Sequence, residues 1–212
     1  MSLFLGKIHF WLFEKIKWFE GLEEDTLALA KVNSIDIDKL VKEANERFGE
    51  KLKDEPLDKL IDESNIHGWL QEAINSAEGR VAFYTTEILK ANENLKANLL
   101  EIYKNKGIEN AKSYIENISD VESAEDIYKA MNDYILEGMP CDRINQILSS
   151  SEDKIEWSAQ RCLHKVFWDK VGGDVSNFYE LRNAWIKSFV NTLNENFVYE
   201  VNNNVMSISK IM

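Results

Sequence analysis

Three histidines are the side chains in this sequence best suited to bind a metal. His9 falls within an apolar stripe at helical spacing, and His67 and His164 also lie on segments with helical periodicity. A buried imidazole needs a partner for its ring nitrogens, which can be a metal ion, a backbone carbonyl or a carboxylate. We therefore take His9, His67 and His164 as candidate ligands of a divalent metal such as zinc or iron.

The residues around the histidines exclude a pair of ligands on one helix. Di-iron helical bundles place a Glu three residues before a His, and none of the three histidines has a Glu at that position. The residues four positions after the histidines are Phe13, Gln71 and Trp168, which are not metal ligands. The metal hypothesis therefore requires ligands from different helices, so that the histidines must converge in space.

Arginines within apolar stripes indicate a second kind of site. Arg182 occupies an apolar stripe of the last expected helix, and Arg161 and Trp168 share a helical face with His164. A buried guanidinium either forms an ion pair or extends its head to solvent, or it binds an anion through its fork of donors. Arg182, Arg161 and Trp168 are therefore candidate contacts for an anionic small molecule or cofactor.

Cys141 is the candidate catalytic thiol. It follows Pro140 at the start of a helix expected over 143–148, where free amides and the helix dipole lower the pKa of a thiol. The alternative is that Cys141 acts as a small apolar residue at a helix junction. With Cys162 as the other cysteine, the sequence has no disulfide framework and no Cys-x-x-Cys pattern, which favours a reduced, cytoplasmic protein.

Composition excludes two large classes of function. Lys and Arg number 25 against 37 Asp and Glu, giving a net charge of −12, which argues against a nucleic-acid partner. The apolar segment 3–19 contains Lys7, Glu14, Lys15 and Lys17, so it does not predict a membrane span. It also lacks a small-residue cleavage site, so we expect no signal peptide and a cytoplasmic location.

The apolar spacing predicts an all-α fold, an irregular single-domain bundle of about seven to nine helices over residues 1–196. Only two prolines and nine glycines interrupt the sequence. Residues 197–212 are expected to form a loosely packed C-terminal tail. The expected helices cover 3–20, 37–48, 66–91, 95–104, 108–118, 120–137, 143–148, 152–170 and 175–195, with a short helical piece over 56–63, breaks at Gly21 and Gly107 and a cap at Ser119.

Two functional hypotheses follow from these features. In the first, polar residues set into aromatic-rich stripes line an interior pocket for a metal or small ligand. In the second, the protein has no catalytic site and forms a homo-oligomer or binds a partner through its aromatic N-terminal helix, which is apolar on more than one face. Whether the protein is an enzyme is left open by the sequence.

Overall fold

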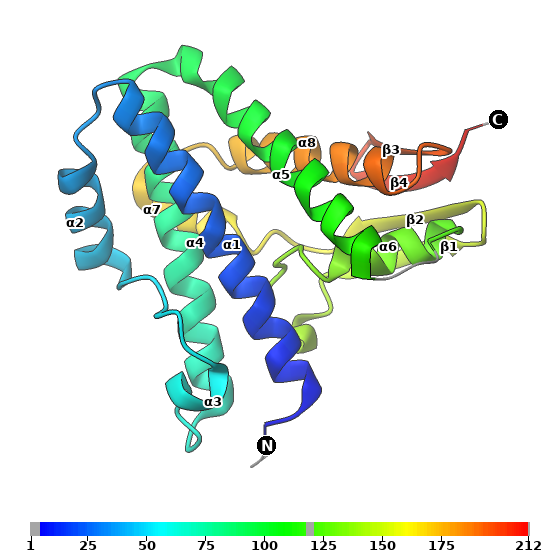
Figure 1. Cartoon of the computed structure of the whole chain (residues 1–212), viewed down its shortest axis with the longest axis horizontal. Helices are drawn as coiled ribbons and strands as arrows, with labels where there is room; N and C mark the ends of the chain where they lie inside the picture. The colour runs from blue at the N-terminus through cyan, green and yellow to red at the C-terminus, as the bar shows by residue number, and fades with distance from the viewer. Residues whose placement is uncertain (1–4, 118–120, 212) are drawn as a thin grey trace. The chain divides into compact units, whose positions relative to one another are not determined.

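The computed structural model describes residues 5–117 and 121–211, which form two compact units (Figure 1). Each unit combines three separate stretches of the chain. The first comprises Met1–Leu95, Tyr134–Pro140 and His164–Val175, and the second comprises Lys96–Asp133, Cys141–Leu163 and Ser176–Met212.

The first unit is helical, and one long helix is at its centre. Its elements are α1 (Lys7–Val32), α2 (Ile37–Phe48), α3 (Leu57–Leu60), α4 (Ile66–Ala91), the 3-10 turn η1 (Glu93–Leu95) and α7 (Lys165–Val171). Helix α4 packs against α1, α2 and α7, and Figure 1 shows α1 running beside it. Apolar residues such as Ile74 and Leu12 are buried where α4 and α1 meet.

The second unit combines helices with a four-stranded antiparallel sheet. Its elements are α5 (Lys96–Asn117), α6 (Ala124–Asn132), the 3-10 turn η2 (Pro140–Asp142), β1 (Asn145–Ser150), β2 (Lys154–Ala159), α8 (Val175–Leu193), β3 (Phe197–Asn202) and β4 (Val205–Lys210). The strand order is β1-β2-β4-β3. Helix α6 packs on β2 and β4, where Tyr128 meets Trp157 edge-on with ring centroids 4.8 Å apart.

The predicted all-α fold is wrong, because the described residues form eight α-helices and this sheet. The segment expected as one helix over 152–170 divides into β2 and α7, and the helix expected over 143–148 is replaced by β1. In β2, the buried residues Ile155 and Trp157 alternate with more exposed ones. This period of two is typical of a half-buried strand.

Residues 197–212 were expected to form a tail, but 197–202 and 205–210 form the hairpin of β3 and β4. Its two turn residues, Asn203 and Asn204, have φ of 50° and 64°. Two-residue hairpin turns require positive φ, and Asn tolerates it better than other residues with side chains. The three consecutive asparagines at 202–204 are therefore a sequence signal for this turn.

Several helix boundaries follow the sequence closely. Helix α4 has the expected bounds, and Asp36 caps α2 by accepting a hydrogen bond from the Lys39 amide at 3.1 Å. Helix α6 begins instead after Ser123, whose hydroxyl accepts from the Asp126 amide, and the expected cap Ser119 lies outside the described residues. None of the helices in the described ranges is long and apolar enough to cross a membrane.

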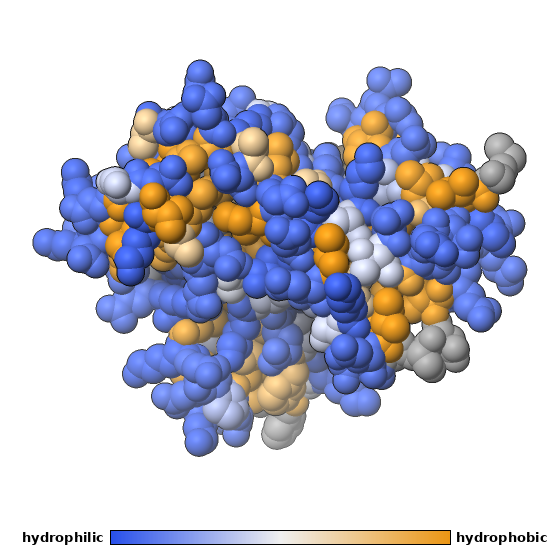
Figure 2. All heavy atoms as spheres, turned by 45° about the horizontal axis from the view of Figure 1, so that its top comes forward, coloured by the Kyte–Doolittle hydropathy of each residue, from blue (hydrophilic) through white to orange (hydrophobic). Residues whose placement is uncertain are grey.

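The exposed surface is mostly hydrophilic on the face drawn in Figure 2, with apolar side chains in separate patches. Exposed large apolar residues occur in both units and include Ile8, Phe10, Ile147, Leu148 and Ile211. Such residues are common on folded proteins when they are scattered.

Helices α1 and α5 continue through Gly21 and Gly107, where the sequence predicted breaks. The reason differs between the two helices. A Cβ on Gly21 would meet no atom within 4 Å, so helix α1 tolerates a glycine there at a modest cost in stability. A Cβ on Gly107 would lie 2.2 Å from Ser188 Oγ and 2.4 Å from the Trp185 carbonyl oxygen. Gly107 is therefore required for the close crossing of α5 and α8.

We expect opposite effects from the same substitution at these two glycines. Gly21→Ala should stabilise the fold by about 0.5–1 kcal/mol, because alanine has the higher helix propensity. Gly107→Ala should destabilise it by about 1–3 kcal/mol, because the helices must move apart. Urea unfolding followed by circular dichroism measures both, and equal effects of the two substitutions would contradict the tight crossing.

Candidate functional site

His9 and His67 form a pair in the first unit. Their Nε2 atoms lie 3.3 Å apart, within hydrogen-bond distance. The Gly6 amide donates to His9 Nδ1 at 2.9 Å, so Nδ1 carries no proton. Neutral His9 therefore has its proton on Nε2 and donates it to Nε2 of His67. Burial, followed by the proximity of His67, lowers the pKa of His9.

This arrangement does not favour a metal between the two rings. A histidine that binds metal through Nε2 normally keeps a proton on Nδ1 and donates it to a neighbour, whereas His9 Nδ1 accepts a hydrogen bond from Gly6. Across residues 5–117 and 121–211, no group of three or more His, Cys, Asp or Glu side chains is arranged to hold a metal ion. The metal role of the histidines stays a prediction without support from this geometry.

His164 has different partners, two carboxylates within the first unit. The side chain is fully buried, with Nδ1 2.9 Å from Glu78 Oε1 and Nε2 3.5 Å from Glu137 Oε1. Burial alone lowers the pKa of an imidazole, but Glu78 and Glu137 outweigh it and raise the pKa of His164 to about 9. His164 is therefore an imidazolium between two carboxylates at neutral pH.

The structure does not bring the three histidines to one point. His67 and Glu78 are eleven residues apart on α4, which is about 16 Å along a helix axis. Because His164 is bonded to Glu78 and His9 to His67, the two clusters lie at different levels of the same helix. His9 and His164 are buried, whereas His67 is exposed. The sequence did not indicate the partner of any of the three.

A third polar cluster in the first unit surrounds Arg80, a further arginine within an apolar stripe. Its guanidinium is bonded to Glu20 and Glu23 of α1, and all three side chains are buried. Burial raises the pKa of Glu23 to about 7, although the adjacent Arg80 opposes this. Arg80 is therefore part of a buried ion-pair cluster and not a site for an external anion.

Two of the predicted anion contacts, Arg161 and Arg182, line one pocket of about 510 Å³ in the second unit. We call it the arginine pocket. Its walls come from the end of β2 and the residues after it, from α8 and from the β3–β4 hairpin. Its lining residues are Ala159, Arg161, Cys162, Ser176, Tyr179, Glu180, Arg182, Asn183, Val201, Asn204 and Met206.

Two aromatic rings contact Arg182, the more buried of the two arginines. The Arg182 guanidinium carbon lies 5.5 Å from the Phe178 ring centroid and 4.9 Å from that of Tyr179, and Arg182 is 8% exposed. Cation–π contacts of this kind stabilise the charge and fix the plane of the guanidinium. The Arg161 side chain is 60% exposed and bonded to Asp142 at 2.9 Å.

The other predicted site residues lie elsewhere. Trp168 is buried on α7 in the first unit and does not line the arginine pocket. Cys141 is exposed in η2, and no α-helix begins there to act on its thiol. The cysteine that lines the arginine pocket is Cys162, which no sequence pattern distinguished.

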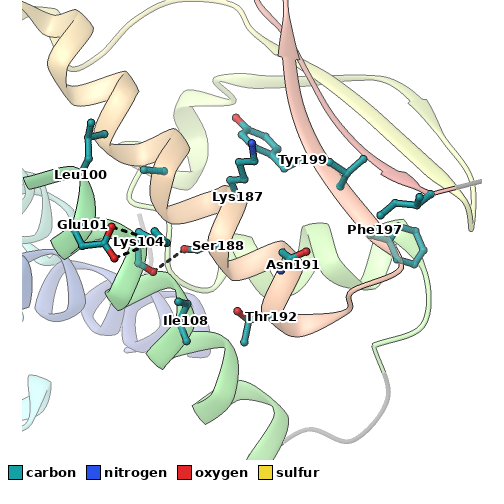
Figure 3. Close-up of a pocket in the computed structure, with 13 residues that line it drawn as sticks. Leu100, Glu101, Lys104, Ile108, Lys187, Ser188, Asn191, Thr192, Phe197 and Tyr199 are labelled. Carbon is teal, nitrogen blue, oxygen red and sulfur yellow. Dashed lines mark hydrogen bonds and ion pairs between the residues drawn. The ribbon is translucent and has the colours of Figure 1, made fainter. Parts of the chain in front are cut away.

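A second pocket in the same unit, the apolar pocket, has a volume of about 650 Å³ (Figure 3). It lies between α5, α8 and β3. Figure 3 shows Phe197 and Ile108 on opposite sides of α8. Its lining residues are Leu100, Glu101, Lys104, Ile108, Ala184, Lys187, Ser188, Asn191, Thr192, Phe197, Val198, Tyr199 and Ile211.

Comparisons of the chain with protein-family models, with curated proteins and with solved structures found no match.

The His164 cluster predicts a pH-dependent contribution to stability. Because the pKa of His164 is raised from 6.5 to about 9, its ion pairs stabilise the fold fully below pH 6.5 and lose this contribution as the pH rises through 9. Glu137→Gln should therefore destabilise the protein most near pH 6 and much less near pH 9.5, as measured by urea unfolding.

The matched control is Glu46→Gln on α2, which changes the net charge equally at a side chain that is 66% exposed. Its effect should be small at every pH in the series. If the free energies of unfolding of wild type and Glu137→Gln differ by the same amount at every pH from 6 to 9.5, a charged His164 is contradicted.

Proposed function

We propose that the protein binds a small organic anion, a carboxylate or a phosphate ester, in the arginine pocket. The observation that carries the proposal is that Arg161 and Arg182 line one pocket although the protein has a net charge of −12. Planar guanidinium groups bind carboxylate and phosphate oxygens through paired hydrogen bonds.

A third donor supports an anionic ligand. The Tyr199 hydroxyl donates to Oδ1 of Asn183, a lining residue, at 2.9 Å, so the oxygen of this amide is already bonded and its NH₂ group is left to donate. The pocket's own carboxylate, Glu180, is 2.7 Å from Lys96 and so is neutralised by it. Asp142, which is outside the lining, pairs with Arg161 in the same way. The lining itself therefore holds two guanidinium groups against one carboxylate, which favours a negative ligand.

The remaining wall indicates the rest of the ligand. Val201, Met206 and the Tyr179 ring supply apolar surface beside the two guanidinium groups. Pockets that combine apolar walls with a few oriented polar groups bind small molecules by burying their apolar part and pairing their charge. A ligand with a flat apolar portion and one anionic group suits this lining better than a bare inorganic ion.

We expect phenyl phosphate to bind wild-type protein more tightly than inorganic phosphate does, as measured by calorimetric titration. Arg161→Met and Arg182→Met should each weaken phenyl phosphate at least about tenfold, because each removes a charge-assisted hydrogen bond worth about 1.5–3 kcal/mol. The exposed side chain of Arg161 keeps the test valid if Arg182→Met fails to fold.

The control is Arg143→Met, which makes the same change of net charge at an exposed residue of the same unit outside the pocket. It should leave the affinity within about twofold of wild type. Equal loss of affinity in Arg143→Met, or no binding of either phosphate by wild type, would refute the proposal.

The second hypothesis, association through the N-terminal helix, is favoured by Ile8 and Phe10, which are 48% and 42% exposed on α1. Trp18 of the same helix, however, packs edge-on against Tyr134 within the first unit, with ring centroids 5.9 Å apart. Because part of the aromatic surface of α1 is used internally, anion binding is the better supported function. Light scattering of the same samples would detect a dimer.

A further inference from the structure

We propose that the apolar pocket is a separate site for a single-chain amphiphile with an anionic head, such as a free fatty acid. The site does not depend on the arginine pocket. It uses a different stripe of α8, in which Ala184, Lys187, Ser188 and Asn191 recur at helical spacing.

The part of the lining around Ser188 is fixed by the crossing of α5 and α8. The Ser188 hydroxyl lies within hydrogen-bond distance of two carbonyl oxygens, at 2.8 Å from that of Lys104 and 2.9 Å from that of Trp185. Gly107 allows the backbones to approach at this point. The pocket is therefore formed before a ligand binds, which reduces the entropy lost on binding.

The walls suit a hydrocarbon chain. The apolar lining comes from Leu100 and Ile108 of α5 and from Phe197 and Val198 of β3, and Ile211, which is 57% exposed, adds apolar surface. A volume of about 650 Å³ is within the range of small-molecule pockets. Transfer of an alkyl chain from water to such a surface is favoured by the hydrophobic effect.

The charges at the edge indicate the head group. Lys104 Nζ is 3.1 Å from Glu101 Oε1 and is neutralised by it. Lys187, by contrast, is exposed and makes no ion pair with any side chain within 5–117 and 121–211, and it lines the pocket (Figure 3). An anionic head would give Lys187 a partner while the chain lies against the apolar walls.

Titration calorimetry with octanoate, decanoate and dodecanoate, each below its micelle concentration, tests the site. Affinity should rise by about fourfold for each methylene that enters the pocket. Dodecyltrimethylammonium should bind at least about tenfold more weakly than dodecanoate, because its head repels Lys187. Equal affinity of the two amphiphiles, or no dependence on chain length, would overturn the proposal.

Two substitutions locate the binding. Lys187→Glu should weaken dodecanoate at least about tenfold, and Ala184→Trp should abolish binding by filling the pocket. The control, Lys129→Glu on α6, makes the same charge change at a side chain that is 71% exposed and outside the pocket, and should have little effect. If Ala184→Trp fails to fold, Lys187→Glu alone decides the outcome.

Other occupants give distinct results. Binding to phosphatidylglycerol vesicles without binding of monomeric dodecanoate would indicate a membrane surface and overturn the proposal. A dimer that forms without ligand and is disrupted by Lys187→Glu would also overturn the proposal. It would indicate that a second copy of the chain occupies the pocket. Dodecanoate binding that persists in Arg182→Met but is lost in Lys187→Glu would distinguish this site from the arginine pocket.

Discussion

The pairing of Arg80 with Glu20 and Glu23 sets the register of the two longest helices in the first unit. A guanidinium without access to water must keep its carboxylates, because removal of one partner of a buried pair commonly costs about 3–5 kcal/mol. Helix α1 therefore cannot slide along α4 by a turn. The same helix α4 carries His67, so the contact of His9 of α1 with His67 depends on this register. Glu78, the partner of His164, also lies on α4, and the three polar clusters therefore form one series along this helix.

Local signals in the sequence were sufficient for α2 and α4 of the first unit, but insufficient for the end of α1, for α7 and for the sheet. The apolar stripe of α4 persists for seven turns, so its bounds could be predicted, whereas β2 has only two buried residues in alternation, Ile155 and Trp157. Such a short pattern fits within a longer helical one, and only pairing with β4 resolves the ambiguity. Gly107 was misread for a similar reason, since its role depends on α8, about eighty residues further along the chain.

The sequence distinguishes unusual side chains but does not show which residues lie beside them in the fold. Arg182 was notable because it interrupts an apolar stripe, and the structure places it in a pocket with Arg161. That grouping depends on the turn between β2 and α7 and on the β3–β4 hairpin, neither of which the helical interpretation contained. Trp168 was grouped with Arg161 on the assumption of one continuous helix, and it is separated from Arg161 because the chain leaves β2 before α7 begins.

The irregularity in β1 has a consequence for the behaviour of the protein at high concentration. Strand β1 is an edge of the sheet, and it exposes Ile147 and Leu148. Its register with β2 shifts between Ile147 and Ser149, so that Leu148 is an extra residue on this strand. A bulge twists an edge and interrupts its row of hydrogen-bonding groups, which makes it a poor template for a strand from another molecule. Ile147 and Leu148 are apolar and exposed at the sheet edge, where they could promote aggregation. The bulge makes it difficult for a strand of another molecule to pair with β1 at this position.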